Sequence, residues 1–356
     1  MATDKRAHFS LLTSAVRPFS TRPVFTRPVC VCVVLPDRIL NDPPFQHPKI
    51  TMSAEQKIKT VFLTGATGYI GGTVGEKLVA AGYKVLGLVR TPEGAEKLKQ
   101  RGVEPVLGSL EDAAVLTEAA QRADAVINTA NSDHRGAIET LLTALEKSGK
   151  PFIHTSGSSV IADDVRGESV NPTVHTEDTF FVPVPHKVAR AAIDRYIRES
   201  GINRGIRTVI ICPTMIYGKG KGIHQDSVQI PKLAELSKAK GAGLYIGKGA
   251  NIWSNVYIDD CADLYLLALE RAPSASFFFA ENGENTLKEV AEVVSRSLGF
   301  GGKTESWNAD EAIKAHGGWA QSAMASNSRV KAVNARKTLQ WSPKGPTLAE
   351  AVEKGL

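Results

Sequence analysis

Cysteine is scarce in this sequence, and long apolar runs are absent. The chain has four cysteines in 356 residues, too few for the disulfide framework of a secreted protein. The cysteines lack the paired CxxC spacing of zinc sites and the histidines share no ligand spacing, so we predict no metal site. No apolar stretch approaches the roughly 18 residues that cross a bilayer. These absences exclude a disulfide-stapled miniprotein and favour a chain without a membrane span in a reducing compartment.

Positive charge is concentrated in the first 51 residues. The formal net charge is +6, and residues 1–51 contribute seven Lys and Arg against three Asp, which is +4 and leaves +2 for residues 52–356. A nucleic-acid surface requires basic residues clustered on the folded part of a protein. No such cluster occurs after residue 51, so we expect no nucleic-acid partner.

Residues 1–51 have the composition of an extension. They contain seven of the 18 prolines and show neither helical nor strand periodicity. Up to Leu35 they are rich in Arg, Ser and Thr, as organelle transit peptides are, although frequent proline fits poorly with an amphipathic targeting helix. We expect a disordered or a targeting extension that is dispensable for folding. The protein would be cytoplasmic in the first case and mitochondrial in the second.

From residue 59 onward, strand and helix patterns alternate. Apolar and β-branched runs predict strands at Lys59–Thr64, Lys84–Val89, Val103–Leu107, Asp124–Thr129, Pro151–Thr155 and Arg207–Cys212. Helical spacing predicts helices at Tyr69–Gly82, Glu93–Arg101, Ala113–Ala120, Gly136–Lys147 and Lys187–Glu199. Such alternation is typical of a parallel sheet covered on both faces. The predicted fold class is α/β, with a doubly wound parallel Rossmann sheet in a dinucleotide-binding core over residues 58–212.

After Cys212 the pattern loosens. Glycines crowd residues 218–222 and 241–249, and helices are predicted at Ser227–Lys240, Asp259–Glu270, Leu287–Leu298 and Leu348–Lys354. We expect residues 213–356 to form a smaller C-terminal substrate lobe that also returns elements to the core.

A glycine-rich segment joins the first strand to the first helix. It reads Thr64-Gly65-Ala66-Thr67-Gly68-Tyr69-Ile70-Gly71. Glycines there let the backbone turn sharply, approach a pyrophosphate and pack the helix on the strand. The helix N-terminus adds free N–H groups and a partial positive charge. Because the segment follows one strand and precedes another, it predicts a dinucleotide-binding site.

The end of the second strand indicates which dinucleotide is bound. Folds that bind NAD usually place an acid near this point, where it holds the ribose hydroxyls. This sequence has Arg90 instead, 19 positions after Gly71. A guanidinium suits a 2′-phosphate, so we expect NADP(H) to be favoured over NAD(H). The plain alternative is a solvated arginine at a strand end.

These motifs resemble those of the extended and atypical short-chain dehydrogenase/reductase superfamily, which includes nucleotide-sugar epimerases and dehydratases. Besides the glycine segment, Asn128-Thr129-Ala130, His154–Val160 and Cys212–Gly218 agree in order. The resemblance implies that the cofactor is also bound by Asn128, Thr129, Ala130, Pro213, Ser109 and Leu110. Ser109 is a departure, because the family commonly has an acid there that bonds the adenine.

The pair that performs the family's chemistry is missing between the fifth and sixth predicted strands. Members use a Tyr-xxx-Lys pair, in which the tyrosine moves a proton and the lysine holds the nicotinamide ribose. Aligning the family's following acid with Asp194 puts Arg190 on the lysine and His186 on the tyrosine. The other register keeps Lys187 but puts Pro183 on the tyrosine. We prefer the first register, because positions one helical turn apart stay in step.

Four residues are therefore the catalytic candidates. His186 could donate or relay a proton, and Arg190 could hold the ribose and disfavour a second positive charge on His186. Ser156 and Ser158, after the fifth strand, could orient a carbonyl. The plain alternatives are a helix cap for His186, a solvated side chain for Arg190, and turn caps for the serines.

Two functions follow. The resemblance implies an NADP(H)-dependent oxidoreductase, or an epimerase- or dehydratase-like enzyme, on a small carbonyl, hydroxyl or sugar-like substrate. The missing tyrosine leaves a second one open, a sensor that binds NADP(H) without turnover. In both cases we expect a small-molecule ligand, and a homodimer is compatible with the sequence.

Overall fold

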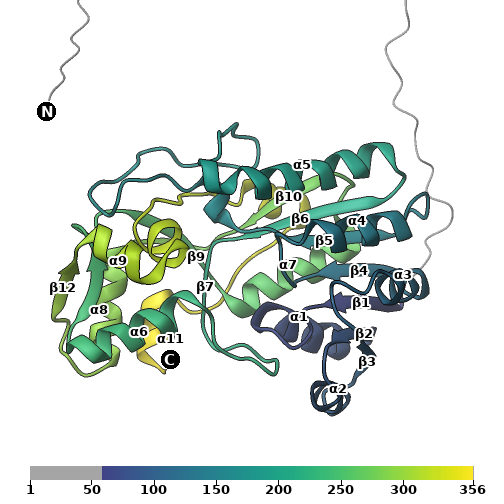
Figure 1. Cartoon of the computed structure of the whole chain (residues 1–356), viewed down its shortest axis with the longest axis horizontal. Helices are drawn as coiled ribbons and strands as arrows, with labels where there is room; N and C mark the ends of the chain where they lie inside the picture. The colour runs from purple at the N-terminus through teal and green to yellow at the C-terminus, as the bar shows by residue number, and fades with distance from the viewer. Residues whose placement is uncertain (1–57, 356) are drawn as a thin grey trace, which may run out of the picture. The chain divides into compact units, whose positions relative to one another are not determined.

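A sheet of seven parallel strands forms the centre of residues 58–355, the part of the chain that this computed structural model describes (Figure 1). Every neighbouring pair in it is parallel. The strand order is β10-β6-β5-β4-β1-β2-β3, which is the doubly wound arrangement. The strands are β1 (Thr60–Thr64), β2 (Lys84–Val89), β3 (Val103–Leu107), β4 (Ala125–Asn128), β5 (Pro151–Thr155), β6 (Arg207–Pro213) and β10 (Ser276–Ala280).

The predicted α/β fold with a parallel Rossmann sheet is confirmed. The six predicted strands all form, and no predicted end differs from the observed one by more than one residue. The sequence analysis missed β10, because its short aromatic run has no alternation or neighbouring helix pattern that distinguishes it from a buried loop. The predicted extension at residues 1–51 lies outside the described residues.

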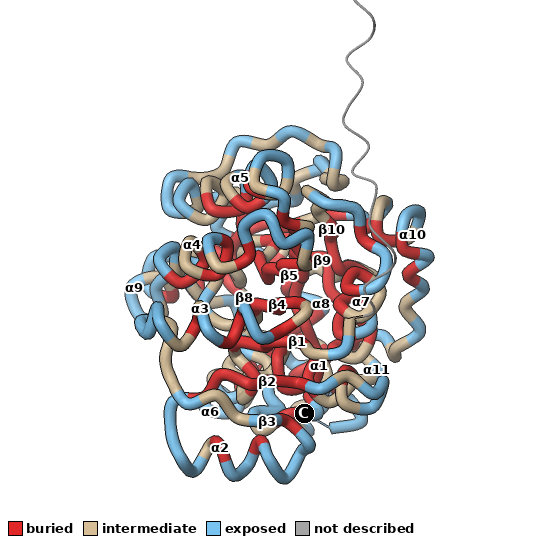
Figure 2. Tube along the Cα trace, turned by 90° about the vertical axis from the view of Figure 1, so that its right-hand side faces the viewer, coloured by how far each residue is buried: buried red, intermediate tan, exposed pale blue. Residues whose placement is uncertain are grey.

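Helices cover both faces of the sheet. One apolar core lies between the sheet and four helices, α1 (Tyr69–Ala80), α2 (Pro92–Lys99), α7 (Ile258–Arg271) and α10 (Val333–Leu339). A second core joins the other face to α3 (Ala113–Arg122), α4 (Arg135–Ala144) and α5 (Val188–Asn203). Figure 2 shows the buried strands between these two helical layers.

The central strand shows why an apolar run forms this structure. Side chains along a strand point alternately to opposite faces. In β1, Val61 and Leu63 belong to one core and Phe62 to the other, and all three are fully buried. A strand buried on both faces needs apolar residues at every position, as the sequence has here.

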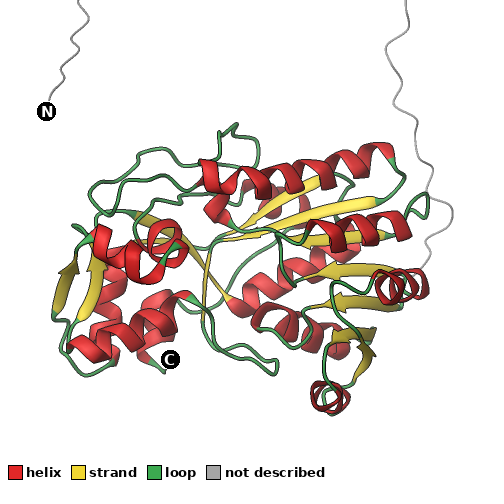
Figure 3. Cartoon of the chain, viewed as in Figure 1, coloured by secondary structure: helices red, strands yellow, loops and turns green. Residues whose placement is uncertain are grey.

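A smaller group of elements follows β6. It contains a three-stranded sheet of β7 (Met215–Tyr217), β9 (Ile252–Tyr257) and β11 (Glu284–Thr286), and a pair of β8 (Gly243–Ile246) with β12 (Thr304–Trp307). A third apolar core packs these strands against α6 (Gln229–Lys240), α8 (Leu287–Ser297), α9 (Ala309–His316) and α11 (Leu348–Glu353). Figure 3 shows these helices and short strands beside the main sheet, connected by long loops. The proposed boundary between residues 212 and 213 stays a prediction.

The strand order indicates where a ligand would bind. Strand order reverses between β1 and β4, and in doubly wound sheets ligands bind outside the carboxyl ends of the strands at this point.

None of the helices in residues 58–355 has both the length and the apolar character needed to cross a membrane.

Candidate functional site

The glycine segment makes a tight turn at the carboxyl end of β1. Gly65 has φ +72°, a left-handed conformation that glycine adopts without strain. A Cβ at Gly65 would lie 2.7 Å from the carbonyl oxygen of Thr129, and a Cβ at Gly71 would lie 2.3 Å from the carbonyl oxygen of Gly65. A side chain at either position would therefore push β1, α1 and the end of β4 apart.

The N-terminus of α1 is open to an anion. Gly68 is the residue before the helix, no side chain caps it, and the first turn contains no acid. The first N–H groups of a helix have no partner within the helix, and together with the helix dipole they favour a phosphate. The turn and helix start at Thr67, Gly68, Tyr69 and Ile70 thus fit the pyrophosphate of a dinucleotide.

Hydrogen bonds tie the ends of β1 and β4 together. The Thr64 hydroxyl donates to Asn128 Oδ1 over 2.5 Å, and the Thr129 hydroxyl donates to the Thr64 carbonyl over 2.7 Å. The backbone N–H of Ala130 also donates to Asn128 Oδ1. These predicted cofactor residues therefore meet beside the glycine turn, where they fix its shape.

A buried histidine completes this network. The Asn128 amide and His154 Nδ1 are 3.0 Å apart, and His154 is fully buried. Burial, with a contribution from the charge of Arg190, lowers the pKa of His154 to about 3. The ring is therefore neutral and, because the amide donates to Nδ1, carries its proton on Nε2. His154 thus holds Asn128 in place without adding charge to the site.

The ends of β2 and β3 carry the other predicted cofactor residues. Arg90 is exposed directly after β2. After β3, the backbone N–H of Ser109 donates to the Asp112 carboxylate over 2.8 Å, and the Ser109 hydroxyl accepts from the N–H of Glu111. Leu110 is partly buried against the core. Ser109 and Leu110 therefore form a local turn at the sheet edge where Arg90 also lies.

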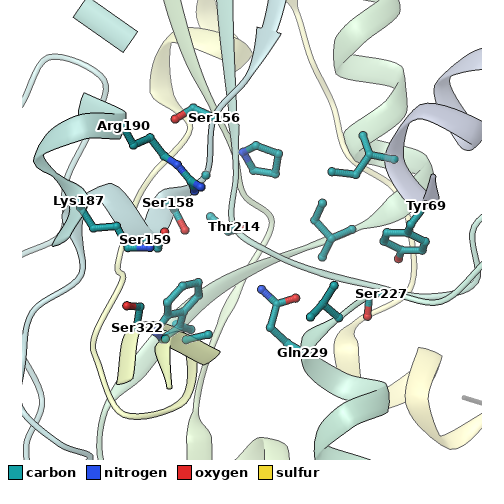
Figure 4. A pocket seen from close by; sticks show the side chains of 18 residues that line it. Tyr69, Ser156, Ser158, Ser159, Lys187, Arg190, Thr214, Ser227, Gln229 and Ser322 are labelled. Atoms are coloured by element: carbon teal, nitrogen blue, oxygen red, sulfur yellow. The ribbon is translucent and has the colours of Figure 1, made fainter. Parts of the chain in front are cut away.

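A cavity of about 290 Å³ lies beside the start of α1 (Figure 4). It is bounded by the starts of α1 and α5, the segments after β5 and β6, and residues of the smaller group of elements. Among the predicted residues, Tyr69, Ile70, Ser156, Ser158, Arg190 and Pro213 line it. Residues that the sequence analysis did not choose also line it, including Lys187, Thr214, Gln229, Trp253 and Ser322.

Ser156, which lines this cavity, forms a hydroxyl–carboxyl pair with Asp194, which does not line it. Ser156 follows β5, and its hydroxyl donates to Asp194 Oδ2 over 2.6 Å. Asp194 lies on α5, is only 7% exposed, and its other oxygen has no partner among the described residues. Burial raises the pKa of Asp194 to about 6, although the Ser156 hydrogen bond and the nearby Arg190 oppose this. A carboxyl with a pKa of about 6 is thus linked to the cavity through one hydroxyl.

Two basic side chains face the cavity, Arg190 from α5 and Lys187 from the short turn before it. The Arg190 guanidinium binds Asp133 through both Nε and a terminal nitrogen, with Nε 2.8 Å from Oδ1. This hydrogen bond holds the pKa of Asp133 below its usual range. Lys187 is half-buried, and burial lowers its pKa, with a further contribution from Arg190. Figure 4 shows both side chains extending toward Ser158 and Ser159.

His186 lies outside the set of residues that line the cavity. It is exposed, and its Nε2 is 2.7 Å from the hydroxyl of Ser322, which does line the cavity. The short turn Pro185–Lys187 before α5 directs the neighbouring Lys187 inward. The predicted pair is therefore separated, with Arg190 in the cavity and His186 reaching it through Ser322.

The tyrosines near the site have their hydroxyls engaged. Tyr69 lines the cavity, but its hydroxyl donates to the Gly218 carbonyl over 2.7 Å. Tyr217 is buried and donates to the Pro346 carbonyl over 2.7 Å. Burial raises the pKa of both Tyr69 and Tyr217 far above the usual range of a tyrosine.

In residues 58–355 no group of three or more His, Cys, Asp and Glu side chains could hold a metal ion.

Ser158 differs from Ser156 in its surroundings. It is almost fully buried, and its hydroxyl lies 2.9 Å from the hydroxyl of Ser328. Ser328 comes from a segment far along the chain, as do Gln229, Trp253 and Ser322, which line the cavity. The sequence did not predict these residues, because nothing in their spacing shows that their segments lie beside the end of β5.

The parallel sheet and the glycine turn after β1 define a Rossmann-type fold, and comparison with known proteins gives the family. The model of the NAD dependent epimerase/dehydratase family matches residues 61–277. The chain belongs to this family, within the extended short-chain dehydrogenase/reductase superfamily. Its family and relatives are of the oxidoreductase and epimerase/dehydratase type.

Two curated relatives and one solved structure illustrate the likeness. The chain is 31% identical to the oxidase ucsJ of an Acremonium species over 83% of this chain and 96% of the relative. It is 30% identical to the decarboxylating sterol-4-alpha-carboxylate 3-dehydrogenase of Dictyostelium discoideum over 64% of this chain and 73% of the relative. The crystal structure of UDP-glucose 4-epimerase from Thermotoga maritima has a TM-score of 0.66, with 19% identity over 83% of this chain and 96% of that one. This last match is a likeness of fold.

Proposed function

We propose that this protein is an NADP(H)-dependent oxidoreductase that acts on a small carbonyl or hydroxyl substrate. The observation that carries the proposal is the hydrogen-bonded pair of Ser156 and Asp194 at a cavity that begins at Tyr69 and Ile70 of the phosphate-binding turn. A hydroxyl backed by a carboxyl that titrates near neutrality is suited to exchanging a proton with a substrate oxygen. The names of the relatives, a dehydrogenase and an oxidase, agree with this chemistry.

The cofactor, when bound, exchanges a hydride with the carbon of the carbonyl or alcohol. The turn at Gly65 and Gly68 and the start of α1 would hold its pyrophosphate, and Arg190 its nicotinamide ribose. The residues of the chain then have to supply or remove one proton at the substrate oxygen.

Ser156 and Asp194 would perform this proton transfer in place of the missing tyrosine. When Asp194 is protonated, it donates to Ser156 Oγ, which frees the Ser156 proton for the oxygen of a carbonyl being reduced. When Asp194 is ionised, the Ser156 proton points to it, and Ser156 Oγ accepts from the hydroxyl of an alcohol being oxidised. In either direction one proton passes between Asp194 and the substrate oxygen, which balances the hydride.

The preference for NADP(H) rests on Arg90. Its exposed guanidinium lies directly after β2, where a ribose 2′-phosphate is expected in this fold. A charge-assisted contact of this kind contributes roughly 1.5–3 kcal/mol, or about ten- to a hundredfold in affinity.

Replacing Arg90 tests the cofactor assignment. In a fluorescence titration, Arg90→Ala should weaken NADPH binding by about ten- to a hundredfold and leave NADH binding nearly unchanged. Arg122→Ala, which removes an exposed arginine at the end of α3, is the control and should change neither. Equal losses for both nucleotides, or none, would defeat the assignment.

His186 has a supporting role in this proposal. Through its contact with the Ser322 hydroxyl, it would relay protons to solvent or set the orientation of Ser322 at the cavity wall. His186→Ala and Arg190→Ala should both lower turnover. Full activity in both variants on a turned-over substrate would show that these roles are wrong.

The second candidate is a sensor that binds NADP(H) without turnover. It is favoured by the tyrosines, since Tyr69 donates to a backbone carbonyl and the segment between β5 and β6 contains no Tyr-xxx-Lys pair. A sensor would bind NADPH tightly and never consume it, and the nucleotide would change its association with a partner. Consumption of NADPH with any carbonyl compound excludes it.

A further inference from the structure

The cavity has charge of one sign. Two basic residues, Lys187 and Arg190, line it, and no Asp or Glu does so within residues 58–355. Its other lining residues are serines, a threonine, a glutamine and apolar or aromatic side chains. A ligand that fills it would meet two cations, several hydroxyls and an apolar wall.

The charge of Arg190 is already compensated. Asp133 accepts two hydrogen bonds from its guanidinium, and a fork-to-carboxylate pair of this kind is both strong and directional. Arg190 is mostly buried in this arrangement, with 18% of its side chain exposed. It therefore brings a positioned but largely neutralised group to the cavity.

Lys187 is not compensated in the same way. It forms no salt bridge with any residue that the structure describes, and the acid whose charge acts on it is Asp133, which Arg190 already engages. Burial and the neighbouring Arg190 both disfavour its positive charge. The positive charge of a half-buried ammonium without a partner is unfavourable, and an anionic group of a bound ligand would stabilise it.

The size of the cavity limits that ligand. About 290 Å³ must hold the nicotinamide end of the cofactor as well as the substrate, and binding sites for drug-sized ligands alone start at about 300 Å³. Part of the cavity lining is apolar, and it includes Trp253, which is fixed by a 2.8 Å hydrogen bond from its indole nitrogen to the Ser326 carbonyl. A large nucleotide-linked substrate does not suit this space.

We propose that the substrate is a small oxo acid or the corresponding hydroxy acid, with its carboxylate bound by Lys187 and its reacting oxygen at Ser156. This inference rests on the proposed function and adds the substrate class to it. The carboxylate neutralises the charge of Lys187. Ser159 lies next to Lys187 and offers a hydroxyl donor to the same carboxylate (Figure 4). The apolar body of the acid faces Trp253.

The test compares acids with their neutral esters in the full chain. Pyruvate, acetoacetate and levulinate differ in the spacing between carbonyl and carboxylate, and each is paired with its methyl ester. With NADPH, kcat/KM for at least one acid should exceed that for its ester by roughly ten- to a hundredfold, the factor of one charge-assisted hydrogen bond. Lys187→Met should abolish this preference through KM, and Lys187→Arg should restore part of it.

Lys240→Met is the matched control, because it removes one exposed positive charge at the end of α6, away from the cavity. It should keep the preference for the acid. Equal kcat/KM for acid and ester in the wild type would overturn the proposal. So would a Lys187→Met variant that loses affinity for NADPH while its preference for the acid persists, because Lys187 would then serve the cofactor.

Failure of the proposed function gives a different result. If NADPH binds but none of the compounds is reduced, calorimetric titration of the NADPH-loaded protein with each acid and ester still decides the question. Binding of an acid that depends on Lys187, without turnover, supports the anion site and contradicts the enzyme. Absence of binding by every acid contradicts the anion site.

Discussion

Asp194 shows how burial gives one residue a role in both stability and chemistry. Its pKa rises from the ordinary 3.8 to about 6 because the carboxyl is buried. A group whose pKa is raised by folding stabilises the protein fully below the pKa of the unfolded state, and this contribution is lost as pH rises through the folded pKa. Above about pH 6 Asp194 is ionised in the folded protein, and its burial in that form lowers the free energy of unfolding.

Asp194→Asn should raise the stability of the protein at neutral pH. A difference of about two pKa units corresponds to about 3 kcal/mol, and the amide oxygen can still accept from Ser156. The difference in unfolding free energy between variant and wild type, measured by urea denaturation, should grow between about pH 4 and 6 and then stay constant. Asp310→Asn, an exposed carboxyl, is the control. A constant difference across this range would contradict the buried titration.

The same residue should set the pH dependence of activity. Reduction needs protonated Asp194 and oxidation needs the ionised form, so reduction should fall and oxidation should rise as pH increases through about 6. In Asp194→Asn both directions should be slow, without this transition. Initial rates with NADPH and with NADP⁺ across this range measure both. Parallel profiles in the two directions would contradict a role for Asp194.

At the scale of elements, the turn between β1 and α1 carries most of the binding site. Gly65 combines a left-handed backbone with the close approach of Thr129, whereas Gly82 has φ +86° and nothing within 4 Å of the position of a Cβ. Replacing either glycine by another residue therefore strains the backbone, but only a side chain at Gly65 would also clash with Thr129.

Replacing these two glycines separates the two effects. Gly82→Ala should cost about 1–2 kcal/mol of stability, the left-handed penalty alone, and leave NADPH affinity unchanged. Gly65→Ala should cost more and weaken NADPH binding strongly, because the clash displaces the end of β4. Thermal unfolding and fluorescence titration measure the two quantities. Similar stability losses with intact NADPH binding in both variants would show that the turn does not form the site.

The elements also show what the sequence could predict. Apolar periodicity was enough for the six predicted strands and for α1 to α5, because buried strands and amphipathic helices are local patterns. It could not show that β10 returns to the sheet, or that Trp253 and Ser322 close the cavity, because those contacts join distant segments. At the start of α5 the sequence left two registers open. The structure puts both Lys187 and Arg190 at the cavity wall and His186 outside it.

At the scale of the whole molecule, the described residues 58–355 belong to one compact unit. Every element of the sheet and of its helical layers starts after residue 59. A chain that begins at Met52 should therefore unfold at the same temperature as the full chain and bind NADPH with the same affinity. Differential scanning calorimetry checks this, and a midpoint lower by several degrees would contradict the expectation that residues 1–51 are dispensable.

The most direct test of the account is a titration of the full chain with NADPH and NADH, followed by the loss of reduced-nicotinamide absorbance with a panel of small carbonyl compounds. We predict that NADPH binds more tightly than NADH and is consumed with at least one member of the panel. Binding without consumption would favour the sensor. Absence of binding by either nucleotide would contradict the cofactor site, and with it the proposed function.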